Sequence, residues 1–254
     1  MLQKKNIIIQ NLNIQYFQSE KIDKNNALVF LHGWGSCTMH FRKTLEKCEN
    51  FIAVDLPGFG NSEISKTAWS LDDYASFIKE FLKKLNIENP IIAGHSFGGS
   101  IGIKYCSNKN KCKKLLLIGS AGIRRKKNAK KYGFFIVAKI FGILLSLPPL
   151  CNLKNIAKEH FYRVIDSADY INAGALTETY RKVIREDLTN DLKKINVPTI
   201  LIWGENDNDT PLRDGKLMQK LISNSRLFIV PNAKHYVFLD NEKKFDEIFL
   251  SQIK

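Results

Sequence analysis

Six short apolar runs, each leading into Gly, Pro, Asn or Asp residues, constrain this chain more than any other feature. They lack the apolar–polar alternation of a strand with one face in water. Runs of this length without alternation suit strands that are buried on both faces of a parallel sheet. They lie at 27–33, 51–58, 90–96, 114–122, 198–207 and 226–235. Two further short strands, at 6–10 and 12–17, are expected to form an antiparallel hairpin.

Helical patterns lie between several of the runs. In the segment 70–86, Ser70 is a candidate N-cap, Asp72 and Asp73 fall in the first turn, and the apolar residues form one stripe. Segments 211–222 and 241–254 carry weaker patterns of the same kind. Alternation of strands and helices over most of the chain predicts an α/β fold with a mostly parallel, doubly wound sheet.

The alternation stops between residues 121 and 197. No buried strand is evident there, and helices are predicted within 128–147, 155–166 and 173–187. We interpret 1–120 and 198–254 as the core, and 121–197 as a helical insertion that covers the sheet.

The composition excludes several other classes of protein. The five cysteines are odd in number and include no C-x-x-C pair, so neither a disulfide framework nor a metal site is expected. The first residues lack the continuous apolar segment of a signal peptide, which predicts a cytoplasmic protein. The formal net charge is +14, but the lysines are spread along the chain without a nucleic-acid-binding motif, so nucleic acid is not an expected partner.

Ser96 is the candidate nucleophile. It stands in Gly94-His95-Ser96-Phe97-Gly98, a G-x-S-x-G match that follows a predicted strand and precedes a predicted helix. In that context the serine occupies a sharp turn, which raises its hydroxyl above the sheet at a helix N-terminus. The alternative is a serine that only forms a turn, because glycine and serine are common in turns.

A serine hydroxyl needs a base, and the base needs an acid that orients it. His235 follows the last predicted strand, and Asp207 follows the strand before it. Ligands gather at the carboxyl ends of parallel strands, so Ser96, Asp207 and His235 are expected to meet. Taken singly, Asp207 could start a turn and His235 could be an ordinary loop histidine.

The oxyanion of an acyl-transfer reaction needs two hydrogen-bond donors. One is expected to be the backbone N–H of Phe97, the residue after the nucleophile. The other is expected from the loop after the third strand, at Trp34, where the flanking Gly33 and Gly35 allow the N–H to point inward.

These residues resemble the α/β-hydrolase-fold superfamily over nearly the whole chain. The matching motifs are His32-Gly33-Trp34, Asp55 to Ser62 (D-x-P-G-x-G-x-S), Gly94 to Gly99, Trp203 to Asp207, and Lys234-His235. The resemblance implies a serine hydrolase with a helical cap at 121–197, no metal or organic cofactor, and a small ester or related acyl substrate. The D-x-P-G-x-G-x-S segment is mainly architectural in that family.

Other activities of the same fold remain alternatives. One is a hydrolase that cleaves carbon–carbon bonds in ring-fission products, although relatives of that kind often carry a small polar residue where His95 stands. Another is a receptor that binds a small molecule without catalysis. Relatives with an aspartate nucleophile are disfavoured because the chain carries Ser96.

The start of the insertion is basic and then apolar. Six basic residues occupy positions 124–131, and an apolar stretch interrupted by Lys139 follows them. The stretch is too short and too charged for a membrane-spanning helix. It suits a cap helix over an apolar acyl or aromatic pocket. The alternatives are a weak contact of residues 124–147 with an anionic membrane surface and a solvated charged face.

Overall fold

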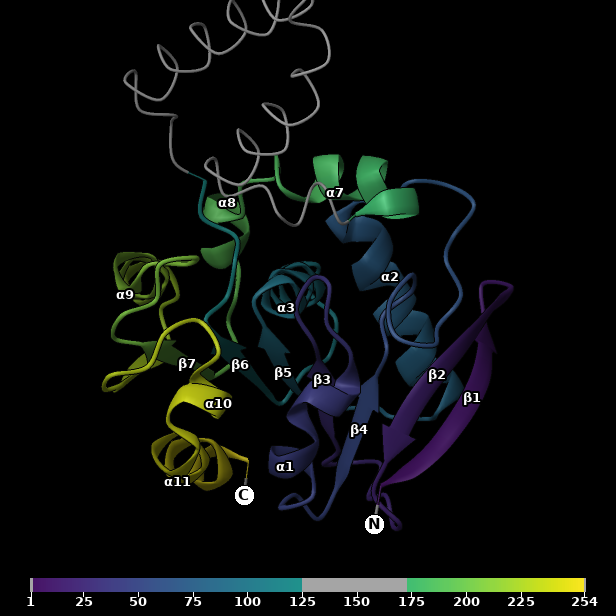
Figure 1. The fold of residues 1–254 in the computed structure, drawn as a ribbon, viewed down its shortest axis with the longest axis horizontal. Helices are drawn as coiled ribbons and strands as arrows, with labels where there is room; N and C mark the ends of the chain where they lie inside the picture. The colour runs from purple at the N-terminus through teal and green to yellow at the C-terminus, as the bar shows by residue number, and fades with distance from the viewer. Residues whose placement is uncertain (1, 125–172, 254) are drawn as a thin grey trace, which may run out of the picture.

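The computed structural model describes residues 2–124 and 173–253 as an eight-stranded sheet with helices on both faces (Figure 1). The strands are β1 Gln3–Ile9, β2 Leu12–Gln18, β3 Leu28–Leu31, β4 Phe51–Val54, β5 Ile91–His95, β6 Lys114–Ile118, β7 Thr199–Gly204 and β8 Ser225–Val230. The helices are η1 Thr38–Phe41, α1 Arg42–Leu45, α2 Leu71–Lys84, α3 Phe97–Ser107, η3 Gly174–Leu176, α7 Thr177–Val183, α8 Thr189–Leu192, α9 Leu212–Leu221, α10 Val237–Asp240 and α11 Glu242–Gln252.

The strand order is β1-β2-β4-β3-β5-β6-β7-β8. β1 pairs with β2, and β2 with β4, in antiparallel fashion, whereas β3 to β8 are parallel to one another. The structure therefore confirms the predicted mostly parallel, doubly wound sheet and the antiparallel hairpin at its start. Because β5 pairs with β3 and β6, the segment that carries Ser96 leaves the sheet near its middle.

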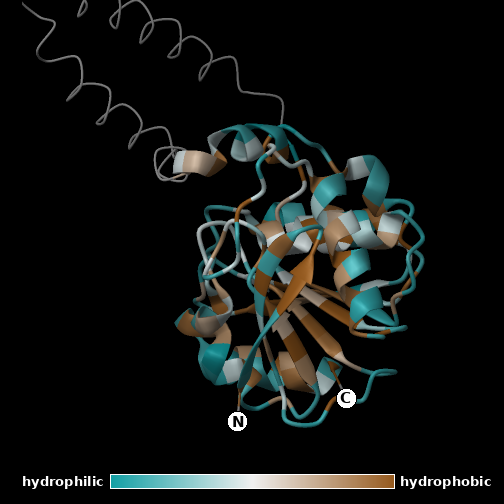
Figure 2. Ribbon diagram, turned by 90° about the vertical axis from the view of Figure 1, so that its right-hand side faces the viewer, coloured by the Kyte–Doolittle hydropathy of each residue, from teal (hydrophilic) through white to brown (hydrophobic). Residues whose placement is uncertain are grey.

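Two apolar cores fill the space between the sheet and its helices. In β3, Val29 and Leu31 belong to the core beneath α2, α3 and α9, whereas Leu28 and Phe30 belong to the core beneath α1, α10 and α11. Figure 2 shows the strands as the most hydrophobic part of the ribbon, between more polar helices. Burial on both faces explains why the runs show no alternation in the sequence.

β8 departs from the prediction. The run at 226–235 was expected to be buried on both faces, but in β8 only Val230 is buried and Ile229 is 42% exposed. The reason is its place at the edge of the sheet, where only β7 pairs with it. The helix predicted at 241–254 is α11, and it is preceded by the separate short helix α10.

The described part of the predicted insertion contains short helices. η3 and α7 lie within the predicted segment 173–187, which confirms that prediction, and α8 follows. The helices predicted at 128–147 and 155–166 lie outside the described residues. The boundaries at 121 and 197 remain predictions. Within residues 2–124 and 173–253, no helix combines the length and the apolar character needed to cross a membrane.

A half-buried lysine ties the end of the insertion to the core. Lys104 on α3 lies 2.7 Å from Glu186, 3.3 Å from Asp72 on α2 and 3.4 Å from Asp191 on α8. Burial alone would lower the pKa of Lys104, but Glu186 and the other two carboxylates outweigh that effect and raise its pKa. The segment before β7 is therefore held against α2 and α3.

Helix α2 begins with the predicted cap. The Ser70 hydroxyl accepts a hydrogen bond from the Asp73 N–H, and the Asp73 carboxylate accepts one from the Ser70 N–H, which together form a capping box. The buried face of α2 carries Tyr74, Phe77 and Phe81, so the start of this helix also sets where those rings pack.

Replacement of the cap tests its contribution to stability. We expect Ser70→Ala to lower the free energy of unfolding by about 1 kcal/mol, because the N-terminal N–H groups of α2 lose their acceptor. Urea denaturation measures this loss. Ser76→Ala, at an exposed position within the same helix, is the control and should cost nothing. Equal stability of Ser70→Ala and the wild type would contradict the assigned cap.

Candidate active site

Ser96 occupies the sharp turn between β5 and α3. Its backbone φ of 50° and ψ of −111° lie outside the regions that residues with a Cβ favour. The turn is held by neighbours: the Ser96 N–H donates to the Ile118 carbonyl at 3.0 Å, and the Ser96 carbonyl accepts from Ala121 at 3.1 Å. The end of β6 thus fixes the conformation that lifts the Ser96 side chain off the sheet.

Two glycines allow this turn to pack. A Cβ at Gly94 would collide with the carbonyl of Gly98, and a Cβ at Gly98 would collide with the carbonyl of Leu31 in β3. Both obstacles are backbone atoms, so a side chain at either position would displace α3 from the sheet. The close approach also sets the N-terminus of α3 at the end of β3, where the next loop begins.

Asp207 and His235 form a buried pair. Asp207 follows β7 and His235 follows β8, and the Nδ1–H of His235 donates to Asp207 Oδ2 at 2.9 Å. The Asp207 side chain is fully buried and the His235 side chain is 10% exposed. A carboxylate in this position fixes the tautomer and the orientation of the imidazole, as a candidate general base requires.

Thr210 completes the surroundings of the carboxylate. Its hydroxyl lies 2.9 Å from Asp207 Oδ2 and 2.9 Å from the Gly119 carbonyl, and its N–H donates to Asp207 Oδ1 at 2.9 Å. The N–H of Asp209 donates to the same oxygen at 2.9 Å. Thr210 was not among the sequence-predicted site residues. Its signal in the sequence is its position three residues after Asp207, a spacing that suits a turn closed on that carboxylate.

His95 supports the loop that carries His235. Its Nε2–H donates to the His235 carbonyl at 3.1 Å, and its buried Nδ1 has no hydrogen-bond partner within the described residues. Burial, followed by the nearby His235 ring, lowers the pKa of His95 to about 3. His95 is therefore a neutral positioning residue. The sequence analysis did not identify this role.

The loop after β3 is positioned by His32. Its Nδ1–H donates to the Gly33 carbonyl at 2.8 Å, and its Nε2 accepts from the Leu56 N–H at 2.9 Å. Burial lowers the pKa of His32 to about 4. A Cβ at Gly33 would lie 3.5 Å from Ser96 Cβ, so this loop passes directly beside the candidate nucleophile.

Trp34 and Phe97 lie next to each other in the wall of the cavity that contains Ser96. Their rings meet edge to face with centroids 5.3 Å apart, and the Trp34 ring also packs against Tyr180 at 5.0 Å. In the part of the chain that the structure describes, no hydrogen bond uses the N–H of Trp34 or of Phe97. The N–H of Trp34, in the loop after β3, and the N–H of Phe97, at the start of α3, therefore stay the candidate oxyanion donors.

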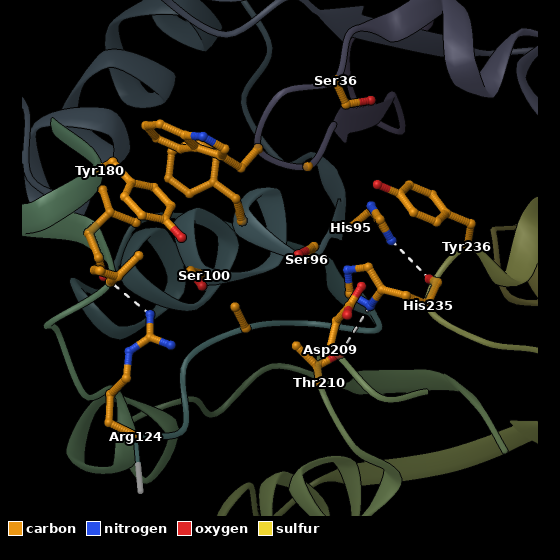
Figure 3. A pocket seen from close by; sticks show the side chains of 16 residues that line it. Ser36, His95, Ser96, Ser100, Arg124, Tyr180, Asp209, Thr210, His235 and Tyr236 are labelled. Atoms are coloured by element: carbon orange, nitrogen blue, oxygen red, sulfur yellow. Dashed lines mark hydrogen bonds between the residues drawn. The ribbon is translucent and has the colours of Figure 1, made fainter. Parts of the chain in front are cut away.

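All five sequence-predicted site residues gather around one cavity, either in its wall or, for Asp207, behind it. The cavity has a volume of about 380 Å³. Its lining is Gly33, Trp34, Ser36, His95, Ser96, Phe97, Ser100, Ala121, Arg124, Tyr180, Val183, Ile184, Asp209, Thr210, His235 and Tyr236. Figure 3 shows Ser96 and Ser100 at the middle, with His235 on one side and Arg124 on the other. Ser96 and His235 are not joined by a hydrogen bond, a contact that often forms only once substrate is bound.

Three other features of the sequence bear on the site: the D-x-P-G-x-G-x-S segment, the basic and apolar segment 124–147, and the expectation that no metal is bound. Asp55 is buried and accepts hydrogen bonds from the Thr38 N–H at 2.8 Å and the Gln15 amide at 2.9 Å, which fits the expected architectural role. Of the basic and apolar segment 124–147, only Arg124 belongs to the described residues. Among those residues, no group of three or more His, Cys, Asp or Glu side chains could hold a metal ion.

Comparison with known proteins agrees with this architecture. The sequence model of the alpha/beta hydrolase family matches residues 28–248. The "Uncharacterized hydrolase YugF" of Bacillus subtilis (strain 168) is 27% identical over 90% of this chain and 90% of its own length. The 2-hydroxy-6-oxononadienedioate/2-hydroxy-6-oxononatrienedioate hydrolase 1 of Pseudomonas putida is 26% identical over 94% of this chain and 91% of its own length.

A solved structure supports the same fold. A thermophilic esterase superposes with a TM-score of 0.70 and 26% sequence identity, over 100% of this chain and 99% of that chain.

The low pKa of His95 predicts a pH-dependent stability. The pKa of His95 is about 3 in the folded chain and about 6.5 in the unfolded chain. Below pH 6.5, His95 therefore binds a proton in the unfolded chain but stays neutral in the folded chain. Between pH 7 and pH 5 this residue should therefore lower the free energy of unfolding by about 2 kcal/mol.

Urea denaturation at pH 7 and pH 5 measures the effect. In His95→Gln, where the side chain keeps an N–H donor but cannot titrate, the loss between the two pH values should be smaller by the same amount. An identical loss in both proteins would show that His95 is not held neutral.

Proposed function

Because the chain belongs to the alpha/beta hydrolase family, we propose that it is a serine hydrolase that cleaves a carboxylic ester through an acyl-enzyme on Ser96. The observation that carries this proposal is the buried Asp207–His235 pair, which opens onto the same cavity as a serine at a strained turn. The three residues follow β5, β7 and β8, which run parallel to one another.

The first half of the reaction forms the acyl-enzyme. The Ser96 oxygen attacks the ester carbonyl carbon while His235 Nε2 takes the hydroxyl proton, and Asp207 stabilises the imidazolium that results. The N–H groups of Trp34 and Phe97 hold the oxyanion. As the tetrahedral intermediate collapses, the C–O bond to the alcohol breaks and His235 returns the proton to the leaving oxygen.

The second half releases the acid. Water attacks the acyl-enzyme carbonyl and gives a proton to His235 Nε2. The same two N–H groups hold the second oxyanion. Its collapse breaks the bond between the acyl carbon and Ser96 Oγ, which takes the proton back from His235 as the acid leaves. The chain's own backbone and side chains, together with water, account for every bond and proton in this route. We predict that the protein acts in the cytoplasm on a small-molecule substrate.

A second candidate is cleavage of a carbon–carbon bond on the same three residues. The resemblance to the Pseudomonas putida hydrolase of 2-hydroxy-6-oxononadienedioate favours it. A receptor without catalysis is a third possibility. Assays with simple esters and with vinylogous diketones, side by side, separate the first two, and covalent labelling of Ser96 separates both from the third.

Loss of the nucleophile is the first test. We expect the wild type to hydrolyse p-nitrophenyl esters and to be labelled by a fluorophosphonate probe, and Ser96→Ala to lose labelling and at least about 10⁴-fold in kcat/KM. Ser107→Ala, one of the other serines of α3, is the matched control and should retain both. Labelling without ester turnover would move the assignment to the carbon–carbon hydrolase. Absence of both in the wild type would favour the receptor.

The acid is tested within its own loop. Asp207→Asn should lower kcat by about 10²–10⁴-fold, because an amide does not hold His235 in the reactive tautomer or stabilise its cation. Asp209→Asn removes the neighbouring carboxylate, which contacts neither His235 nor Ser96 by a hydrogen bond among the described residues. Steady-state kinetics on a neutral ester compare the two variants. Equal losses in both would contradict the role assigned to Asp207.

A further inference from the structure

We propose that Arg124 makes one end of the cavity an anion-binding subsite, and that the acyl groups this protein transfers to Ser96 carry a terminal carboxylate. The inference rests on the proposed serine hydrolase function and adds a substrate class to it. It is carried by the direction of one arginine, by the polarity of the two cavity ends, and by a serine between them.

Arg124 is turned into the cavity and held there. Its Nε donates to the Glu186 carbonyl at 3.2 Å and its Nη2 donates to the Val183 carbonyl at 3.2 Å. Both acceptors are neutral, so they orient the guanidinium without pairing its charge. Nη1 makes no hydrogen bond within the described residues, and Arg124 lines the cavity.

Burial lowers the pKa of Arg124, and the carboxylates of Asp187, Glu186 and Asp214 partly offset that effect from a distance, but the first two make their close contacts with other partners. Glu186 pairs with Lys104 at 2.7 Å. Asp187 accepts the backbone N–H groups of Arg124 at 2.8 Å and Thr189 at 2.9 Å. Among the residues that the structure describes, no carboxylate forms an ion pair with the Arg124 guanidinium. A half-buried guanidinium with an open N–H favours an anion at that position, because a charge-assisted hydrogen bond stabilises both partners.

The two ends of the cavity differ in charge. Arg124 and Tyr180 lie at one end, and His235 and Asp209 lie at the other, as Figure 3 shows. An anionic group is therefore attracted to the first end and repelled from the second.

The reaction assigns those ends to the two parts of the substrate. His235 returns a proton to the leaving oxygen, so the leaving group lies on the His235 side of Ser96. The acyl group then extends the other way, toward Arg124. The negative charge thus belongs on the acyl part, and the leaving group on the Asp209 side is neutral.

Ser100 lies on the path between them. It stands one helical turn after Ser96 on α3 and therefore on the same face of the helix. Its side chain lines the cavity, and its hydroxyl makes no hydrogen bond within the described residues. A hydrocarbon end would leave both this hydroxyl and the Arg124 N–H without partners, whereas a carboxylate supplies acceptors.

Matched p-nitrophenyl esters test the subsite. Mono-esters of dicarboxylic acids with four to eight carbons are compared with the esters in which the distal carboxylate is replaced by a carboxamide of the same shape. Reactions without enzyme correct for spontaneous hydrolysis. At the best chain length we expect wild-type kcat/KM to favour the carboxylate about tenfold or more, chiefly through KM. Added salt should reduce this preference.

Variants assign the preference to Arg124. Arg124→Gln should lower the carboxylate-to-carboxamide ratio of kcat/KM by about tenfold or more, and Arg124→Lys, which keeps the charge but not the fork, should lower it less. Arg185→Gln removes an exposed charge outside the cavity lining and should leave the ratio unchanged. A ratio near one in the wild type, or an unchanged ratio in Arg124→Gln, would overturn the proposal.

Binding separates this inference from the proposed function. In Ser96→Ala, quenching of tryptophan fluorescence by the bound nitrophenyl group reports Kd without turnover, because Trp34 lines the cavity. The carboxylate ester should bind about tenfold more tightly than the carboxamide, and Arg124→Gln should remove the difference. Equal Kd values would refute the subsite even if both esters are hydrolysed. If Ser96→Ala still binds the carboxylate ester more tightly but the wild type hydrolyses neither ester, the subsite stands and only the ester-hydrolase function is refuted.

Discussion

The contact between α3 and the sheet is the constraint on which the site depends. Gly94 and Gly98 let the helix approach β5 and β3 so closely that neither position has room for a Cβ. That approach, together with the bonds from Ser96 to β6, holds Ser96 in a conformation that a residue with a side chain would otherwise leave. The same approach brings the N-terminus of α3 to the loop after β3, where the second candidate oxyanion donor lies.

Around this contact, neutral groups hold the candidate catalytic residues. His32 fixes the loop that carries Trp34, His95 fixes the loop that carries His235, and Thr210 fixes the carboxylate of Asp207. Because burial lowers the pKa of both supporting histidines, they donate hydrogen bonds without adding positive charge near His235. Apart from His95 Nδ1, the ring nitrogens of both histidines have hydrogen-bond partners, and these bonds stiffen the two loops.

Much of this arrangement was predictable from the sequence. The apolar runs identified the parallel strands, and Ser96, Asp207 and His235 could be chosen because each follows such a run. The half-exposed β8 was not predictable, since exposure depends on the order of strands in the sheet. The role of His95 rests on a contact with a carbonyl far along the chain. Arg124 belonged to a basic run in the sequence, and only the fold shows that its side chain points inward.

The connection between β6 and β7 has an evolutionary consequence. The two strands pair with each other in register, so the chain departs from the sheet and rejoins it at adjacent positions. An exchange of residues 123–185 would leave the strand ladder, the bond from Ala121 to Ser96, and the Asp207 and His235 loops unchanged. Lys104, which binds Glu186 and Asp191 just before β7, would anchor the graft. In such a chain, the segment between β6 and β7 can change in evolution while the loops that carry Ser96, Asp207 and His235 stay the same. Substrate preference can therefore change faster than the type of reaction.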